Sequence, residues 1–347
     1  MNKSFTPLAS FAVLAFCSLT AKAQVTTGQA PLYPDAGNPP AGLPTIDEGS
    51  VLLCIGMSQA NDECGGRRPE HTGGWRDQST LPVAIVNGGI DNWDVRMIIE
   101  DPNDYWGQVE QRITEAGYTN DDVQLIWGKN ATRSGIAQGG SGDVVTERTV
   151  LRDNLILIQQ QAEDRFPNLR LGFHSSRAYG GFCTLNSEPF SYDSIFAIEG
   201  WTGEAGAIES SAIWYRGPYI WADGSNPRSG DGLVWLEEDF IDDGCHPEQS
   251  GIDKIAAMNE DWFAQLSYAP PGSPPPPAPP PPAPPPPAPP PPAPPPPAPP
   301  PPAPPPPDPD PPSTTSKNGG ATGIPGIGLL LALYGFARAR RRTHGER

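Results

Sequence analysis

Val51-Leu-Leu-Cys-Ile55, followed at once by Gly56-Met57-Ser58, is the stretch that decides the fold. An apolar run of this length that stops at a glycine is typical of a strand buried on both faces, as the strands of a parallel sheet are. Three comparable apolar runs come later in the chain and end in polar or glycine-rich turns, at residues 82–86, 123–127 and 169–173.

Helical patterns separate and follow these predicted strands. Apolar side chains recur with helical spacing over residues 105–116 and 147–165, and a last helix is expected over residues 252–263. Strands that alternate with helices predict an α/β domain with a parallel sheet. Ligands of such sheets bind at the carboxyl ends of the strands, so functional residues are expected just after each strand.

Residues suited to chemistry follow three of the predicted strands. Ser58 follows the first strand, Gly89 the second and Asn130 the third. A glycine at such a place allows backbone N–H groups to approach a ligand closely. Near the end of the domain, Asp243 and His246 stand three residues apart, just before the last predicted helix.

These blocks, in this order, resemble the SGNH hydrolases, a family of esterases and lipases also called GDSL-type. The family pattern is Gly-Asp-Ser, Asn-x-Gly-Ile, Gly-x-Asn-Asp and Asp-x-x-His, and this chain has Gly56-Met57-Ser58, Asn87-Gly88-Gly89-Ile90, Gly128-Lys129-Asn130-Ala131 and Asp243-Gly244-Cys245-His246. The resemblance covers residues 50–266. It implies a three-layer α/β/α sandwich with a central parallel sheet.

The resemblance also implies a role for each block. Ser58 would be the nucleophile, His246 the general base and then the general acid, and Asp243 the group that holds the imidazole tautomer. The oxyanion would be met by the Ser58 and Gly89 amides and by the Asn130 side chain. The implied reaction is hydrolysis of a carboxylic ester without metal or cofactor.

Two departures from the family pattern favour an alternative function. Met57 replaces the usual aspartate before the serine, and Ala131 replaces the aspartate after Asn130. Both changes remove polar support around the nucleophile and leave the named roles in place. The alternative is therefore a catalytically impaired domain of this fold that binds carbohydrate.

Each catalytic role also has a purely structural alternative. Ser58 would suit the cap of the helix that follows it. Asp243 and His246 would suit a turn with a capping aspartate. Asn130 would suit a turn that needs a left-handed backbone conformation.

Four further residues are candidate substrate contacts: Arg177, Tyr179, Glu188 and Trp93. Salt bridges and loop hydrogen bonds would explain the first three equally well, and core packing would explain Trp93. His174 ends the fourth predicted strand and is a second candidate for the base.

Proline marks the end of the foldable domain. Of the 48 prolines in 347 residues, 33 lie between residues 270 and 312, mostly in a Pro-Pro-Pro-Pro-Ala repeat. Such a segment supplies no backbone donors to helix or sheet, so the domain is expected at residues 50–268, after an N-terminal extension at 24–49. Residues 269–318 predict a semi-rigid polyproline II spacer, on the order of 120 Å long. A segment that binds a proline-recognising partner is the alternative.

Charge and cysteine content bear on partners and compartment. Residues 24–318 carry a formal net charge of −23, which repels nucleic acid and anionic lipid. The four cysteines of the domain predict one or two disulfides in an oxidising compartment, with three pairings open: Cys54, Cys64, Cys183 and Cys245.

Both ends of the chain carry targeting patterns. Residues 1–23 predict a secretory signal peptide cleaved before Gln24, and a lipoprotein signal centred on Cys17 is the alternative. Residues 319–347 combine Gly319-Gly320, an apolar stretch and an arginine-rich end, which resembles the GlyGly-CTERM sorting tail of Gram-negative bacteria.

Proteins with that tail are cut near the two glycines by a rhomboid-type protease and are then exported or attached to the surface. A simple C-terminal membrane anchor is the alternative. The domain is therefore expected outside the cell or on its surface, after transient anchoring in the inner membrane. The expected substrate there is an acylated polysaccharide.

Overall fold

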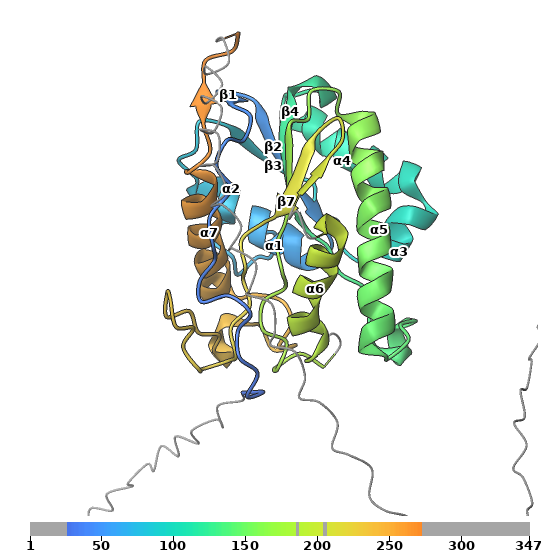
Figure 1. The fold of residues 1–347 in the computed structure, drawn as a ribbon, viewed down its shortest axis with the longest axis vertical. Coiled ribbons are helices and arrows are strands. Elements are labelled where there is room, and N and C mark those ends of the chain that lie inside the picture. Colours follow the sequence, from blue (N-terminus) through green and yellow to red (C-terminus); the bar gives the residue numbers. More distant parts are fainter. Residues whose placement is uncertain (1–25, 185–186, 204–206, 273–347) are drawn as a thin grey trace, which may run out of the picture. The chain divides into compact units, whose positions relative to one another are not determined.

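A central sheet organises the domain (Figure 1). Within residues 26–184, 187–203 and 207–272, which the computed structural model describes, six strands pair in the order β3-β2-β4-β5-β7-β6. All pairs are parallel except that of β6 with β7. The strands are β2 Val51–Gly56, β3 Ala84–Asn87, β4 Val123–Lys129, β5 Leu171–His174, β6 Ala207–Glu209 and β7 Ile213–Arg216.

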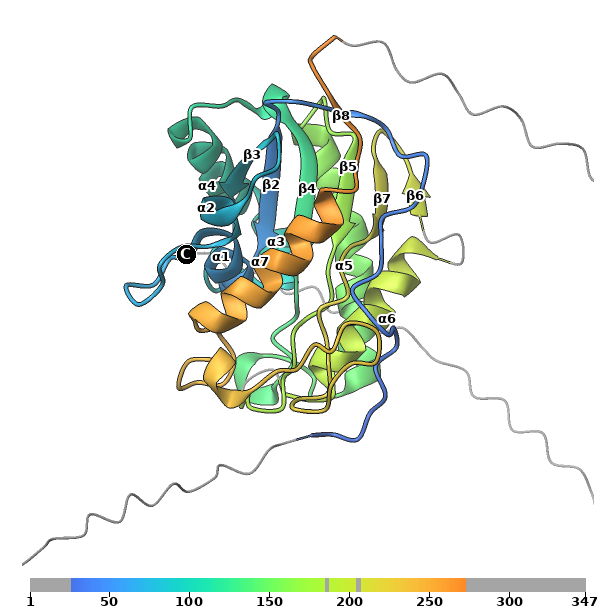
Figure 2. The same cartoon turned by 90° about the vertical axis from the view of Figure 1, so that its left-hand side faces the viewer.

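Helices cover both faces of this sheet (Figure 2). One face carries α1 Ser58–Gly65, α2 Trp75–Gln78 and α7 Gln249–Phe263, and the other carries α3 Val95–Glu100, α4 Pro102–Glu115, α5 Val144–Arg165 and α6 Phe190–Thr202. Alternate residues of β2 serve the two cores, with Leu52 on the α7 side and Leu53 on the α5 side. This is the expected three-layer α/β/α sandwich with a mainly parallel sheet.

The order of the strands reverses between β2 and β4. From β2 the chain first adds β3 on one side and then adds β4, β5 and β7 on the other. In open α/β sheets, ligands bind outside the carboxyl ends of the strands where the order reverses in this way. Ser58 comes just after β2 and Asn130 directly follows β4, so the fold brings both to the carboxyl ends of these neighbouring strands.

The ends of several elements differ from the prediction because caps and turns lie outside the apolar pattern. The helix expected from residue 105 begins at Pro102, where Asp101 accepts a hydrogen bond from the Asp104 N–H at 3.3 Å. The helix expected from residue 147 begins at Val144 after the capping Asp143. Three other elements start two or three residues away from the expected position. α7 starts three residues before residue 252, and β3 and β5 start two residues after residues 82 and 169.

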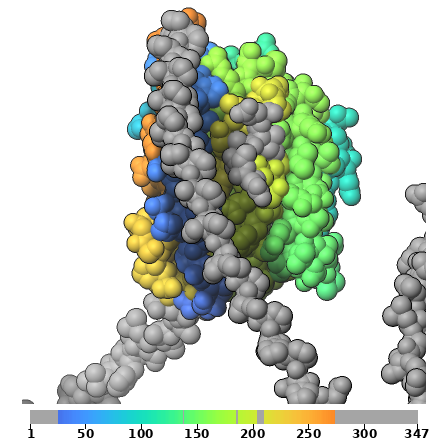
Figure 3. All heavy atoms as spheres, viewed as in Figure 1, coloured from blue at the N-terminus to red at the C-terminus, as the bar shows by residue number. Residues whose placement is uncertain are grey.

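The N-terminal strap, residues 26–45, runs along the surface of the domain (Figure 3). It is held at one end by the buried Asp223 carboxylate, which accepts the Thr27 N–H at 2.6 Å and the Gly28 N–H at 2.9 Å. Further along, the Tyr219 N–H donates to the Ala36 carbonyl at 3.0 Å. The strap leads into β1 Ile46–Asp47, which pairs in parallel with β8 Tyr268–Ala269. The first and last parts of the domain are thereby joined.

Four predicted features lie outside the described residues: the signal peptide at 1–23, the cleavage site at Gln24, the spacer beyond residue 272 and the tail at 319–347. Within the described part of the chain, no helix combines the length and apolar character needed to cross a membrane.

Candidate active site

Ser58 stands at the start of α1, immediately beyond β2. The backbone before it is extended at Met57, and Gly56 has a φ of 141°, a conformation that favours glycine. A Cβ at Gly56 would also overlap the Lys129 carbonyl. The chain can therefore turn sharply from strand to helix and present the partly exposed Ser58 hydroxyl above the sheet.

His246 joins Ser58 to Asp243. Its Nε2 lies 2.7 Å from Ser58 Oγ, and its Nδ1 lies 2.5 Å from Asp243 Oδ2. The other Asp243 oxygen accepts the backbone N–H groups of His246, at 2.9 Å, and of Cys245, at 2.8 Å. The Asp-x-x-His spacing places the carboxylate so that it holds both the turn and the ring.

These hydrogen bonds set the charge of Asp243. Burial by itself raises the pKa of the Asp243 carboxyl, but the bonds from the His246 amide and ring and from the Cys245 amide outweigh it, and the pKa lies below its usual range. A carboxylate that stays ionised fixes the Nδ1–H tautomer of His246, which leaves Nε2 to accept a proton.

Two disulfides hold the segments that meet here, and they decide the pairing that the sequence leaves open. Cys54 in β2 is bonded to Cys64 in α1, and Cys183 is bonded to Cys245 next to His246. The Gln59 side chain also donates to the Cys245 carbonyl at 2.5 Å. The loop that carries His246, called the histidine loop below, is thus tied both to α1 and to the loop after β5.

The Asn130 side-chain N–H groups and the Gly89 backbone N–H differ in the hydrogen bonds that they already make. Asn130 is buried, its Nδ2 lies 3.4 Å from His174 Nδ1, and its Oδ1 has no hydrogen-bond partner among the described residues. The Gly89 N–H donates to Asn87 Oδ1 at 3.0 Å, and the backbone of Asn61 packs where a Gly89 side chain would be. The expected Gly89 donor is therefore engaged within its own turn.

His174, the second candidate base, is buried on the α5 side of the sheet. Its ring lies 5.0 Å from that of Trp201 and 5.8 Å from that of Trp214 between ring centroids, and it contacts Asn130. Burial lowers the pKa of His174 to about 3. The ring is therefore neutral, and it packs behind Asn130 while His246 contacts Ser58.

Two of the four candidate substrate contacts are buried, and the other two are half-buried. Glu188 accepts the Gly180 N–H and the Trp221 indole N–H, both at 2.8 Å. Arg177 and Tyr179 are buried. Trp93 is only half-buried and packs against Tyr105 at 5.6 Å between ring centroids. Loop hydrogen bonds therefore account for Glu188.

The fold of this chain is similar to that of several solved structures. No family model matches the chain and no curated protein matches it in sequence. A protein from Slackia heliotrinireducens, provisionally named an SGNH hydrolase, is 12% identical over 62% of this chain and 99% of its own, with a TM-score of 0.38.

Two further similar structures are named as esterases or lipases. A catalytic mutant of an acetylxylan esterase from Geobacillus stearothermophilus is 15% identical over 62% of this chain and 94% of its own, with a TM-score of 0.36. A lipase/acylhydrolase from Enterococcus faecalis is 13% identical over 60% of this chain and 92% of its own, with a TM-score of 0.35. The function proposed below is argued from the site itself.

Sequence reasoning missed a set of buried charges beneath the nucleophile. Lys129, at the end of β4, forms an ion pair with Glu63 of α1, and each side chain is at most 2% exposed. Neighbouring Asp62 is fully buried and binds Arg67 at 2.7 Å. The sequence did contain a sign of these charges, because the acidic Asp62 and Glu63 lie in a helix that packs against an apolar strand, and buried carboxylates need cationic partners.

No group of three or more histidine, cysteine or acidic side chains that could hold a metal ion occurs in residues 26–184, 187–203 and 207–272.

Proposed function

We propose that this protein is a serine ester hydrolase in which Ser58, His246 and Asp243 carry the reaction. The observation that supports this most strongly is the continuous series of contacts from Asp243 through His246 to Ser58, at 2.5 Å and 2.7 Å. A serine hydroxyl attacks an ester readily only when a base takes its proton, and a base works best when a third group orients it.

The reaction follows from these positions. His246 Nε2 takes the Ser58 proton as Oγ bonds to the ester carbonyl carbon, and Asp243 stabilises the imidazolium that forms. When the tetrahedral intermediate collapses, the carbon–oxygen bond to the alcohol breaks and His246 returns the proton to the leaving oxygen. Water then attacks the acyl-serine by the same route, releasing the acid and restoring Ser58.

Two donors are proposed for the oxyanion. The Ser58 N–H lies in the first turn of α1, where backbone N–H groups have no partner within the helix. Asn130 follows the strand next to β2, and the pairing of Gly56 with Lys129 puts it at the same height as Ser58. The Gly89 amide would have to share its hydrogen with Asn87, so we propose it only as a weaker third donor.

Hydrolysis of p-nitrophenyl acetate tests this proposal. The wild-type protein should release p-nitrophenol, and Ser58→Ala should reduce the rate by about 10³-fold or more, because nucleophile and base act as one unit. Ser211→Ala is the matched control, since Ser211 is exposed and its hydroxyl donates to Glu163 at 2.9 Å. Equal rates for wild type and Ser58→Ala would leave the non-catalytic, carbohydrate-binding alternative.

We further propose that the enzyme is exported and acts on acylated polysaccharide. Two disulfides support an oxidising compartment, and the apolar start of the chain supports export. A domain outside the cell meets polymeric rather than cytosolic esters. Acetate release from acetylated xylan, compared with chemically deacetylated xylan, tests the substrate class, and hydrolysis of small esters alone would contradict it.

A further inference from the structure

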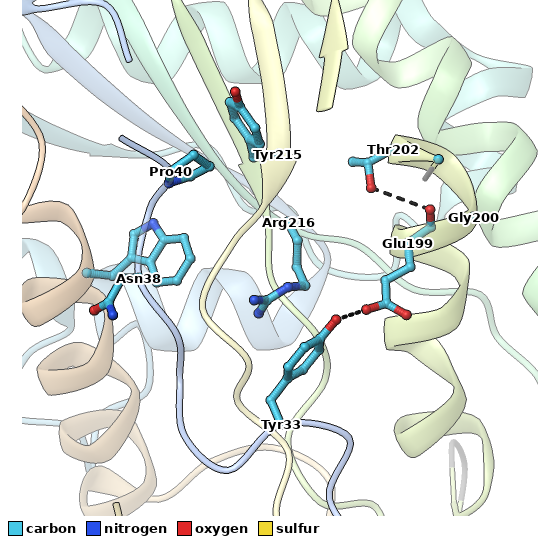
Figure 4. A pocket seen from close by; sticks show the side chains of 10 residues that line it. Tyr33, Asn38, Pro40, Glu199, Gly200, Thr202, Tyr215 and Arg216 are labelled. Carbon is cyan, nitrogen blue, oxygen red and sulfur yellow. Dashed lines mark hydrogen bonds between the residues drawn. The ribbon is translucent and has the colours of Figure 1, made fainter. Parts of the chain in front are cut away.

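A pocket lies at the end of β7, and Figure 4 shows the side chains that line it. We call it the Arg216 pocket; its volume is about 640 Å³, and it lies between the N-terminal strap (Tyr33, Asn38), the last turn of α6 (Glu199, Thr202) and the end of β7 (Tyr215, Arg216). The pairing of β6 with β7 runs from Glu209 and Ile213 to Ala207 and Tyr215. β7 is three strand positions from β2, which at roughly 4.8 Å per strand is about 14 Å.

Arg216 supplies hydrogen-bond donors to this pocket. Its guanidinium stacks at 4.1 Å over the centre of the Tyr33 ring, and a Cβ at Gly37 would lie 3.1 Å from one of its nitrogens. Its one hydrogen bond within the described residues runs to the Gly217 carbonyl at 3.3 Å, and no carboxylate of those residues lies within ion-pair distance. Stacking holds the group in place while most of its N–H donors stay available.

The opposite wall supplies acceptors. Glu199 accepts the Tyr33 hydroxyl hydrogen through one carboxylate oxygen, which leaves the second oxygen for another donor. α6 ends at Thr202, so the partly negative carbonyl end of the helix also faces this pocket. Figure 4 shows Arg216 and Glu199 on facing sides, with Tyr33 below them.

We propose that the Arg216 pocket binds a neutral sugar ring, as a site separate from the ester-cleaving one. A sugar hydroxyl both donates and accepts, so it can satisfy the Arg216 and Glu199 sides at once. A free carboxylate would be drawn to Arg216 but repelled by Glu199 and by the end of α6. An apolar ligand would leave the remaining Arg216 donors and the second Glu199 oxygen without hydrogen-bond partners in the pocket.

Tyr33 and Tyr215 also suit a sugar ligand, because they offer partly exposed aromatic surface for the apolar face of the sugar ring. Asn38 is exposed at the rim, and no hydrogen bond to its side chain occurs within the described residues, so its amide is free to bind a hydroxyl. The volume lies within the range of small-molecule sites, about 300 to 1,000 Å³.

Calorimetric titration of the full chain carrying Ser58→Ala tests this site without turnover. The probes are xylotriose, cellotriose and maltotriose, with sodium acetate and sodium benzoate for comparison. At least one trisaccharide should bind with a dissociation constant near or below about 1 mM. Adding Arg216→Met or Asn38→Ala should weaken that binding, by roughly tenfold or more for Arg216→Met.

Arg165→Met is the matched control, because Arg165 also stacks on an aromatic ring, that of Trp106 at 5.5 Å, outside this pocket; it should leave binding unchanged. Asn38 is exposed, so Asn38→Ala keeps the test decisive if Arg216→Met does not fold. The proposal is overturned if no trisaccharide binds, if Arg216→Met and Asn38→Ala bind as tightly as their parent, or if acetate or benzoate binds more tightly than the sugars. None of these results depends on esterase activity.

Discussion

Asp243 is the residue of the candidate site whose surroundings most directly fix its charge. Replacing it with asparagine keeps the shape but removes the negative charge beside His246 Nδ1. The amide can also present a donor there and favour the wrong tautomer of the ring. We expect Asp243→Asn to lower kcat for p-nitrophenyl acetate by about 10³-fold or more at neutral pH. An unchanged kcat would show that His246 needs no carboxylate.

The same substitution predicts a pH dependence of stability. Because the pKa of Asp243 is lower in the folded protein than its ordinary value, the ionised carboxylate stabilises the fold above about pH 4. That contribution is lost as the pH falls through the lower, folded pKa. Urea unfolding should therefore show wild type more stable than Asp243→Asn at pH 7, with the two converging in strong acid. A difference that stays constant down to pH 2 would contradict this.

Asn130 gives a second prediction for a single residue. If its Nδ2 group meets the oxyanion, Asn130→Ala should lower kcat by roughly 10²-fold and change KM little, because the bond is made mainly in the transition state. His174 packs behind Asn130, so thermal unfolding should be measured in parallel to separate a local loss from a loosened core. An unchanged kcat would return Asn130 to a purely structural role in its turn.

Sequence determines the arrangement of these residues most directly where a short motif fixes the local geometry. Asp243 and His246 are three residues apart, and their contact needs only a local turn. Gly89 was harder to place, because its amide bonds to Asn87 two residues earlier, and a Gly-Gly turn does not show which way its N–H points. The positions of Arg177 and Glu188 depend on loops that come together only in the folded domain.

At the level of elements, two disulfides fasten the segments that carry the site. Cys54–Cys64 closes a separation of 10 residues between β2 and α1, whereas Cys183–Cys245 closes one of 62 residues and anchors the histidine loop. Longer closed loops restrict the unfolded chain more, so loss of the second bond should cost about 4 kcal/mol and loss of the first about 3 kcal/mol.

The two bonds should also differ in their effect on activity. Replacing both Cys183 and Cys245 with alanine should lower kcat as well as stability, because His246 is the next residue in the chain. Urea unfolding and p-nitrophenyl acetate hydrolysis of this double variant, with the Cys54→Ala/Cys64→Ala pair for comparison, check both effects. Full activity in a folded Cys183→Ala/Cys245→Ala protein would show that the histidine loop holds its shape without the bond.

Long apolar runs and helical periodicity predicted β2, β4, α5 and α7, whereas α6 and β7 were not predicted. β7 is four residues long and only one of them is fully buried. α6 follows a proline and has no side-chain cap. Such elements are stabilised by the neighbours they pack against rather than by a local pattern, so a single sequence gives little sign of them.

At the level of the whole molecule, the domain is one part of a longer chain whose two ends carry targeting patterns. We expect mature protein to begin at Gln24 and to end near Gly319 or Gly320. A 17-residue apolar stretch at 321–337 that contains four glycines and one proline is a poor permanent anchor, and residues that unwind a helix suit cleavage within the membrane. Intact-mass spectrometry of medium and membrane fractions measures both ends. A membrane species that keeps residues 338–347, with no shortened form elsewhere, would refute the sorting hypothesis.

The measurement that bears most directly on the central claim is covalent labelling of the protein with a fluorophosphonate, followed by peptide mass spectrometry. An activated serine attacks the phosphorus atom of the reagent, and fluoride leaves that phosphorus. The new oxygen–phosphorus bond marks the nucleophile regardless of the natural ester. We predict one adduct, on Ser58, which disappears in both Ser58→Ala and His246→Ala while both variants keep the thermal unfolding of a folded domain. No adduct on the folded wild-type protein, or an adduct on a different serine that persists in Ser58→Ala, would contradict the proposed site.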